Sequence, residues 1–283
     1  MSLFELVERP DLDAPVFVLA LDGWIDAGLG AAQALAAIVE SSEMETVAVF
    51  DSDALLDHRA RRPTMHLVDG LNTGLSWPSI ELRATTDRQG NEALFLIGAE
   101  PDHLWRAFSR AVVDLALEFG SRLVVGLGAY PAPVPHTRPT KLVSTATSAE
   151  LAELVGFVPG QIDVPAGVHA AIERRCADVG LPAVGLWAQV PHYAAAMPYP
   201  AAGLALIEGL ARIADLRFDP GGLAAEAAAS RDRIDSLVAN SEEHLEMVRQ
   251  LEHHVDAMEA ADQGGLPTGD ELAAERERFL REP

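Results

Sequence analysis

The amino-acid sequence predicts an α/β fold, a three-layer α/β/α sandwich around a mixed, mostly parallel sheet. Short apolar runs typical of buried strands alternate along the chain with Ala-rich segments whose apolar residues recur at helical spacing. Two neighbouring strands are separated only by the turn-forming residues 88–91, which indicates a hairpin and therefore a mixed sheet. Hydrophobic residues make up 49% of the 283 and charged residues 23%, as in a packed globular protein.

Predicted strands and helices alternate along the first half of the chain. The run 16–21 is wholly apolar and stops at the turn signal Asp22-Gly23, so it predicts a buried strand. Pro101 suits the first position of a helix, where its missing N–H is not needed. The predicted elements are, in order, strand 16–21, helix 27–39, strands 46–50, 79–86 and 93–97, and helix 101–118.

The second half continues the alternation around a proline-rich segment. A buried strand at 123–127 is ended by Gly128. Four prolines in the nine residues 131–139 exclude a helix or a central strand and predict an extended, stiff loop. The elements predicted after this loop are strand 142–147, helices 149–155 and 168–179, strand 183–190 and helix 199–213.

A change of composition after Pro220-Gly221-Gly222 divides the chain into an α/β domain, 1–220, and an acidic helical extension, 221–283. Apolar residues recur at near-heptad spacing over 223–261, which predicts one long helix. After Gly264-Gly265, a capping box of Thr268 and Glu271 predicts a final helix ending at Arg281. We expect the extension to fold back as a helical hairpin, with the residues Leu272, Phe279 and Leu280 against the long helix or a neighbouring protomer.

Charge and cysteine usage limit the partners and the compartment. The net charge of −22 opposes binding to phosphate backbones and anionic lipid, so we expect no nucleic-acid and no membrane partner. No apolar run reaches the length of a membrane span, and we expect no signal peptide because residues 1–10 are acidic and lack an apolar core. Cys176 is the only cysteine, so no internal disulfide can form. These features predict a cytoplasmic protein in which Cys176 is a small packed hydrophobe.

The sequence lacks the common motifs for cofactors, metals and nucleophilic catalysis. It has no dinucleotide-binding glycine pattern, no P-loop, no nucleophile elbow and no HExxH. His253 and His254 are adjacent on a predicted helix and therefore point about 100° apart, which disfavours a shared metal ion. We expect no cofactor and no metal.

Ionisable side chains follow five predicted strands, and ligands of such sheets bind beyond the carboxyl ends of the strands. The residues of this candidate cleft are Asp22, Asp26, Asp51, Asp53, Arg59, Arg62, Glu100, Arg106, His136, Arg138 and His192. We expect five of them to share a single depression: Asp26, Asp51, Glu100, Arg106 and His136. The alternative is that each is a helix cap, a turn residue or a surface ion pair.

Five motifs carry a resemblance to a known family. On them the chain resembles the PAC2 (proteasome assembly chaperone 2-like) family, in its actinobacterial branch. The resemblance covers nearly the whole chain, and the proline-rich motif is the specific one. The motifs are GWIDAG at 23–28, FDSDALLDHRARRP at 50–63, GAEPDHLWR at 98–106, GAYPAPVPHTRP at 128–139, and VPHY at 190–193 followed by PYPAA at 198–202.

The resemblance implies a phosphorylase- or hydrolase-like sandwich, self-association, and a role in assembling the proteasome core like that of eukaryotic and archaeal members. Archaeal and eukaryotic members often end in a hydrophobic–Tyr–any tripeptide that docks into the proteasome α-ring. This sequence ends Arg281-Glu282-Pro283, so that route of docking does not carry over.

Three functions stay open from the sequence. The first is a non-enzymatic assembly chaperone or interaction protein, a homotrimer or homodimer whose C-terminal helices contact a partner protein. The apolar stretch 194–202 and the proline-rich loop would make the self-contact. The second is a small-molecule enzyme, with Glu100 or Asp26 as base and an anionic group held by Arg59, Arg62, Arg138 and His136. The third is a binding protein that uses the same cleft without chemistry.

Overall fold

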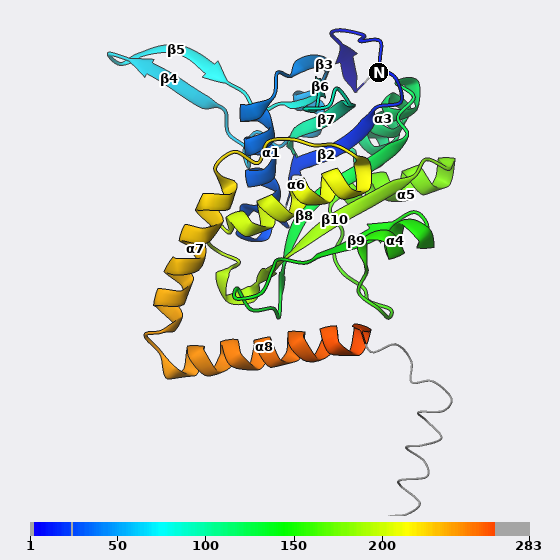
Figure 1. The fold of residues 1–283 in the computed structure, drawn as a ribbon. Coiled ribbons are helices and arrows are strands. Elements are labelled where there is room, and N and C mark those ends of the chain that lie inside the picture. The colour runs from blue at the N-terminus through cyan, green and yellow to red at the C-terminus, as the bar shows by residue number, and fades with distance from the viewer. Residues whose placement is uncertain (1–2, 24, 264–283) are drawn as a thin grey trace, which may run out of the picture.

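The computed structural model describes residues 3–23 and 25–263, and Figure 1 shows how their elements are arranged. The strands are β1 (Phe4–Leu6), β2 (Val16–Asp22), β3 (Glu45–Phe50), β4 (Thr64–Val68), β5 (Leu71–Ser76), β6 (Ile80–Thr86), β7 (Glu92–Ala99), β8 (Leu123–Ala132), β9 (Leu142–Ala146) and β10 (Ala183–Pro191). The helices are α1 (Gly30–Ser41), α2 (Ser52–Leu55), α3 (Trp105–Glu118), α4 (Ala149–Val155), α5 (Val168–Val179), α6 (Pro200–Ala214), α7 (Leu223–Val238) and α8 (Glu242–Gln263), with short 3₁₀ turns at Ala27–Leu29 and His192–Ala194.

One mixed sheet forms the middle layer of the described residues, in the order β1-β3-β6-β7-β2-β8-β10-β9. The strands β2, β3, β7, β8 and β10 run in one direction, and β1, β6 and β9 run against them. The hairpin predicted around residue 90 is confirmed as the antiparallel pair β6 and β7. Because the majority strands are parallel, their carboxyl ends all reach the same edge of the sheet.

Helices cover both faces of this sheet, as the sequence predicts (Figure 1). Alternate residues of β2 divide between the two cores: Val16 and Val18 pack on the side of α1 and α6, and Phe17 and Leu19 on the side of α3 and α5. All four are almost wholly removed from solvent. A strand buried on both faces must be apolar throughout, which is why this run was recognisable in the sequence.

The motif GWIDAG packs directly against the motif PYPAA. Gly28 has a φ of +62°, and a Cβ atom there would lie 2.6 Å from the Cβ of Tyr199. Backbone hydrogen bonds also hold Gly28, since its N–H donates to Ala195 O, just before the second motif, and its carbonyl accepts the Tyr199 N–H, both at 2.8 Å. These two motifs therefore hold the start of α1 against the start of α6.

Two predicted boundaries are wrong. The helix predicted from Pro101 begins at Trp105, because the preceding backbone N–H groups of Asp102 and His103 donate to Leu55 O instead. The strand β8 does not stop at Gly128 but continues to Ala132. Its pairing with β2 ends at Gly126; beyond that point it pairs with β10 and makes one isolated bridge, from Ala129 to Asp26. Pro131 is tolerated there because one side of β8 has become an edge.

The single long helix predicted for the start of the extension is also wrong, because it is two helices, α7 and α8. The Ser241 hydroxyl accepts the His244 N–H at 3.3 Å, and Glu242 and Glu243 occupy the first turn of α8, where the helix dipole favours acidic side chains.

No helix among the described residues is long and apolar enough to cross a membrane. The final helix predicted from Thr268, with its three apolar residues, lies outside the described residues, and the division at residue 220 stays a prediction.

A β-hairpin made of β4 and β5 was not predicted. The two strands pair with each other and, within the described residues, with no other strand. Figure 1 shows the hairpin projecting from the body of the molecule. Its apolar side chains are largely exposed, among them Leu67 at 57%, Leu71 at 69% and Met65 at 51%. A strand exposed on both faces carries no inside–outside alternation, so the pattern that predicts other strands is missing here.

Candidate functional site

All the candidate cleft residues lie towards the carboxyl edge of the sheet, but they do not meet in one depression. Five strand spacings separate β3 from β10, which is roughly 24 Å at about 4.8 Å each. The residues fall instead into three places, around Asp26 and Glu100, around Asp51 and Asp53, and around His136 and Arg138. Asp22 is the last residue of β2, next to the first of these. The remaining residues, Arg59, Arg62, Arg106 and His192, are exposed.

In the first of these three places, the carboxylates of Asp26 and Glu100 both cap helices. Asp26 accepts hydrogen bonds from the N–H groups of Ala31 and Ala32, at 2.8 and 3.0 Å, at the start of α1. Glu100 is buried and accepts the N–H of Val168, the first residue of α5, at 2.6 Å. Burial raises the pKa of Asp26 in spite of these hydrogen bonds. This geometry matches the alternative in which the residues act as caps.

The second place is a shallow depression beside the end of β3. Asp51 caps the short helix α2 by accepting the Ala54 N–H at 3.1 Å. Asp53 pairs with His58, whose Nε2 lies 2.9 Å from its Oδ1. The His58 ring in turn meets Trp77 edge-on, with ring centroids 5.0 Å apart. The carboxylates are thus used within the protomer, and the exposed Trp77 is the apolar part of this surface.

A crevice between α5 and the sheet extends the first place and contains two residues that sequence reasoning missed. It is lined by Asp26, Glu100, His169 and Trp187, and a continuation reaches Glu173. The Nε2 atom of His169 is buried and has no hydrogen-bond partner among the described residues. Burial lowers the pKa of His169 to about 4 and raises the pKa of Glu173. His169 and Glu173 are four residues apart on the sheet-facing side of α5, within an otherwise apolar stripe. This spacing was the signal that the sequence offered for them.

His169 is expected to make the protein less stable as the pH falls below neutral. Between pH 6.5 and 4 the unfolded chain protonates this histidine and the folded protein does not, so the free energy of unfolding decreases as pH falls through that window. We expect a contribution of about 2 kcal/mol between pH 7 and pH 5. Urea unfolding of His169→Gln at both pH values should show that much less pH dependence. The exposed His192→Gln is the control, and equal pH dependence in wild type and His169→Gln would contradict the assignment.

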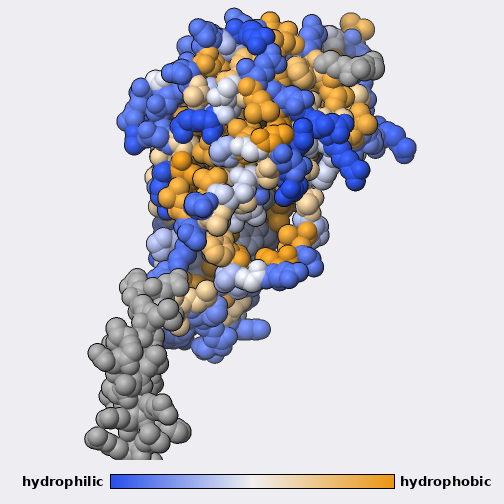
Figure 2. Space-filling view, turned by 90° about the vertical axis from the view of Figure 1, so that its right-hand side faces the viewer, coloured by the Kyte–Doolittle hydropathy of each residue, from blue (hydrophilic) through white to orange (hydrophobic). Residues whose placement is uncertain are grey.

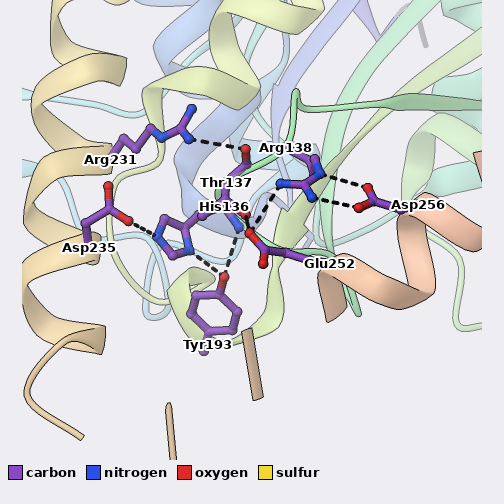
Figure 3. A network of polar contacts seen from close by, with 8 residues as sticks. All are labelled: His136, Thr137, Arg138, Tyr193, Arg231, Asp235, Glu252 and Asp256. Carbon is purple, nitrogen blue, oxygen red and sulfur yellow. Dashed lines mark hydrogen bonds and ion pairs between the residues drawn. The ribbon is translucent and has the colours of Figure 1, made fainter. Parts of the chain in front are cut away.

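The third place joins the proline-rich loop to the C-terminal helices (Figure 3). His136 is only 4% exposed. Its Nδ1 lies 2.7 Å from the Tyr193 hydroxyl, and its Nε2 lies 2.9 Å from Asp235 Oδ1 on α7. The Tyr193 hydroxyl also accepts the backbone N–H of His136 at 2.9 Å. The ring therefore bridges the loop, the end of β10 and α7.

Arg138 makes the main contact of the same loop with α8. Its guanidinium donates to both carboxylate oxygens of Asp256, at 2.8 and 2.7 Å, and to Glu252 at 3.2 Å (Figure 3). The hydrogen bonds with Asp256 raise the pKa of Arg138, and Arg138 in turn lowers the pKa of Asp256. Lys141 adds an ion pair with Glu259 at 2.8 Å. A basic loop thus holds an acidic helix by paired charges.

An apolar groove lies between this loop, the segment 156–162 and α8. We call it the α8 groove; it has a volume of about 590 Å³ and is lined by Tyr130, Val134, Phe157, Ile162, Val255 and Met258, among others. Phe157 is 51% exposed, Ile162 63% and Met258 54%. Figure 2 shows this side of the molecule, where apolar side chains surround a hollow. Its size and apolar lining suit the binding of another molecule.

Comparison with known proteins identifies the family. The PAC2 family model matches residues 20–238. The chain belongs to the PAC2 family. No curated protein matches it. Among solved structures, a Mycobacterium tuberculosis protein is 36% identical with a TM-score of 0.83, and the match covers 93% of this chain and 92% of that one.

Two further relatives come from actinobacteria. A Mycobacterium tuberculosis protein described as a proteasome-assembly chaperone homologue is 31% identical, with a TM-score of 0.76 over 82% of this chain and 99% of its own. A PAC2 family protein from Streptomyces avermitilis is 32% identical, with a TM-score of 0.73 over 83% of this chain and 99% of its own. These matches support the sandwich fold and the actinobacterial branch predicted from the sequence motifs.

Proposed function

We propose that this PAC2 family protein is a non-enzymatic assembly chaperone or interaction protein that works as a homo-oligomer and is linked to proteasome assembly. One observation carries the proposal. The carboxylates at the strand ends cap helices or form ion pairs within the protomer, whereas large exposed apolar side chains cluster on the β4–β5 hairpin and in the α8 groove. Exposed apolar patches of this kind mark interaction sites.

The hairpin is the proposed surface of self-contact. Its exposed residues Met65, Leu67, Val68, Leu71 and Leu75 have no core to pack against within the described protomer. The stretch 194–202 does not suit that role, because most of it is used inside the protomer. A two-stranded hairpin is marginally stable alone, so packing against a second copy would stabilise it. We propose a trimer or a dimer, located in the cytoplasm.

The C-terminal helices are the proposed site of a foreign partner. α8 supplies one wall of the α8 groove, and the acidic residues on its outer side add charge that would select a partner of basic character. The proteasome link is supported by the 31% identical relative described as a proteasome-assembly chaperone homologue.

Introducing charge into the α8 groove is expected to weaken partner binding. In Phe157→Asp with Ile162→Asp, two carboxylates would have to be buried on docking, so we expect at least a hundredfold loss of affinity for purified actinobacterial proteasome α-subunits. Biolayer interferometry would measure it. Val7→Asp with Leu117→Asp adds the same charge at exposed apolar positions elsewhere and should bind like wild type. Equal binding by both double variants would contradict a role for the groove.

The alternative function is a small-molecule enzyme or ligand-binding protein that uses the crevice beside α5. The Nε2 of His169, which is buried and has no hydrogen-bond partner in the described part of the chain, favours it together with Asp26 of the same crevice, whose pKa is raised by burial, because perturbed ionisable groups gather at functional sites. A panel of metabolites tested for thermal stabilisation of wild type and His169→Gln would examine it. A compound that stabilises only the wild type would support the alternative.

A further inference from the structure

We propose that the crevice beside α5 binds a planar nitrogen heterocycle, and that the indole ring of Trp187 occupies the place of that ligand in this structure. The proposed site rests on the alternative function, a ligand-binding crevice, and names the class of compound that it would take. It is separate from the β4–β5 hairpin and the α8 groove, so it can fail while the chaperone function stands.

The floor of the crevice is made of glycines in the interiors of two strands. Gly126 of β8 lies opposite Gly185 of β10, and the next pair on the same face is Gly128 and Trp187. A Cβ atom on Gly126 would point at the ring of His169 on α5, so this face of the sheet is the one that α5 covers. Interior glycines weaken a strand, and they often mark a place where a ligand approaches the backbone closely.

The indole ring of Trp187 lies directly over two of these glycines. A Cβ atom on Gly128 would be 2.4 Å from Cζ3 of the ring, and one on Gly185 would be 2.9 Å from its Nε1. Both distances are too short for a real contact, so the ring can lie there only because both residues are glycine. The ring Nε1 donates a hydrogen bond to Thr145 Oγ1 at 3.1 Å. The floor therefore accommodates a planar ring that carries an N–H at its edge.

Polar side chains surround this ring where an apolar core would be expected. Thr145 Oγ1 accepts the indole N–H and donates to Glu173 Oε2 at 2.6 Å. His169 adds an Nε2 that is buried and has no hydrogen-bond partner within residues 3–23 and 25–263. Burial lowers the pKa of His169 to about 4, so at pH 7 the ring is neutral and Nε2 can form one hydrogen bond with a ligand. An unpaired buried polar atom is costly, and a role in binding accounts for it.

Two small cavities flank the indole, and their lining indicates how the site would open. Their volumes are about 10 and 20 Å³, each the size of a single water molecule, and His169 and Trp187 line both. Trp187 is only partly buried, so its ring can turn towards solvent without crossing either core. The joined space would offer Thr145 Oγ1 to an N–H of the ligand and His169 Nε2 to a second ring nitrogen. These two groups would select a fused ring with two nitrogens over a hydrocarbon of the same shape.

His169→Leu separates a role in binding from a role in stability. Replacing the unpaired nitrogen by an apolar side chain should raise the Tm at pH 7 and weaken the binding of benzimidazole, a fused ring with two nitrogens, by about tenfold or more. The exposed His192→Leu is the control and should leave both unchanged. Benzimidazole binding by His169→Leu equal to that of the wild type would overturn the proposed site.

Calorimetric titration of the full-length protein at pH 7 compares benzimidazole with indene, a hydrocarbon of the same shape. The wild type should bind benzimidazole at least about tenfold more tightly than indene, because only benzimidazole can pair with Thr145 and His169. Trp187→Ala should bind benzimidazole about tenfold more tightly than the wild type, because the ligand no longer has to displace the indole. Trp77→Ala, which removes an exposed indole elsewhere, should bind like the wild type.

The outcomes separate the ligand class from the crevice itself. Indene bound as tightly as benzimidazole would keep a ligand-binding crevice but overturn its selectivity for a nitrogen heterocycle. No gain in Trp187→Ala would show that the indole does not occupy the ligand's place, and no binding of either compound to any of the proteins would also overturn the proposed site. If Trp187→Ala does not fold, the comparison of the two compounds on the wild type decides.

Discussion

Leu67→Asp with Leu71→Asp is expected to convert the assembled protein into a monomer. Both leucines are more than half exposed on the projecting hairpin, at 57% and 69%. Burying one leucine contributes about 2 kcal/mol, and an unpaired carboxylate resists burial, so the double change should weaken self-association at least a thousandfold. Size-exclusion chromatography with light scattering at micromolar concentration would measure the mass. The fold should persist, because the hairpin packs on neither core.

The control for the hairpin is Val7→Asp with Leu117→Asp, which places the same charge at exposed apolar positions on the body. That variant should keep the mass of the wild-type assembly. A wild-type protein that is already a monomer at micromolar concentration would contradict self-association altogether. If the hairpin variant keeps the mass of the wild-type oligomer, the self-contact must lie on another surface.

Arg138→Glu is expected to detach α8 from the proline-rich loop. The change removes the paired hydrogen bonds to Asp256 and the bond to Glu252, and puts a third carboxylate between those two. Amide exchange over Glu242–Gln263 should rise by about tenfold or more while the central strands stay protected. Raising the salt concentration should also weaken docking in the wild type, because these ion pairs are partly exposed.

Arg249→Glu is the matched control for Arg138→Glu. It makes the same charge change on α8 itself, where Arg249 is exposed and pairs only loosely with Glu246, at 3.8 Å. Its exchange should resemble that of the wild type. If α8 exchanges alike in both variants, the charged loop does not hold the helix, and the apolar contacts of Val248 and Val255 must do so.

The sequence predicted the elements whose burial leaves a pattern. β2 was recognisable because both of its faces are buried, and the β6–β7 hairpin because turn residues separate two short runs. The β4–β5 hairpin has neither signal, since its side chains face solvent on both sides of the protomer. The break between α7 and α8 had a signal in Ser241-Glu242-Glu243, but the apolar spacing of the surrounding residues outweighed it.

The candidate site was predicted only in part, for a geometric reason. Strand direction fixes the edge at which a residue such as Asp51 or His136 lies, and this part follows from the sequence. How far apart they lie depends on the order of the strands, and four strand spacings separate β3 from β8. The order is set by long-range pairing, which local patterns do not record. His169 was missed because its four-residue spacing from Glu173 indicates only that both lie on one face of the helix, and does not reveal the crevice that they line.

The central claim is that the protein works through its apolar surfaces and not through the crevice beside α5. The most direct test is assembly of the proteasome core from separately purified actinobacterial α- and β-subunits, followed by the appearance of peptidase activity. Three proteins would be compared: wild type, the groove variant Phe157→Asp with Ile162→Asp, and the crevice variant His169→Gln. The account predicts faster assembly with wild type and the crevice variant, and no acceleration with the groove variant. Acceleration that survives in the groove variant but is lost in the crevice variant, or none with wild type, would contradict it.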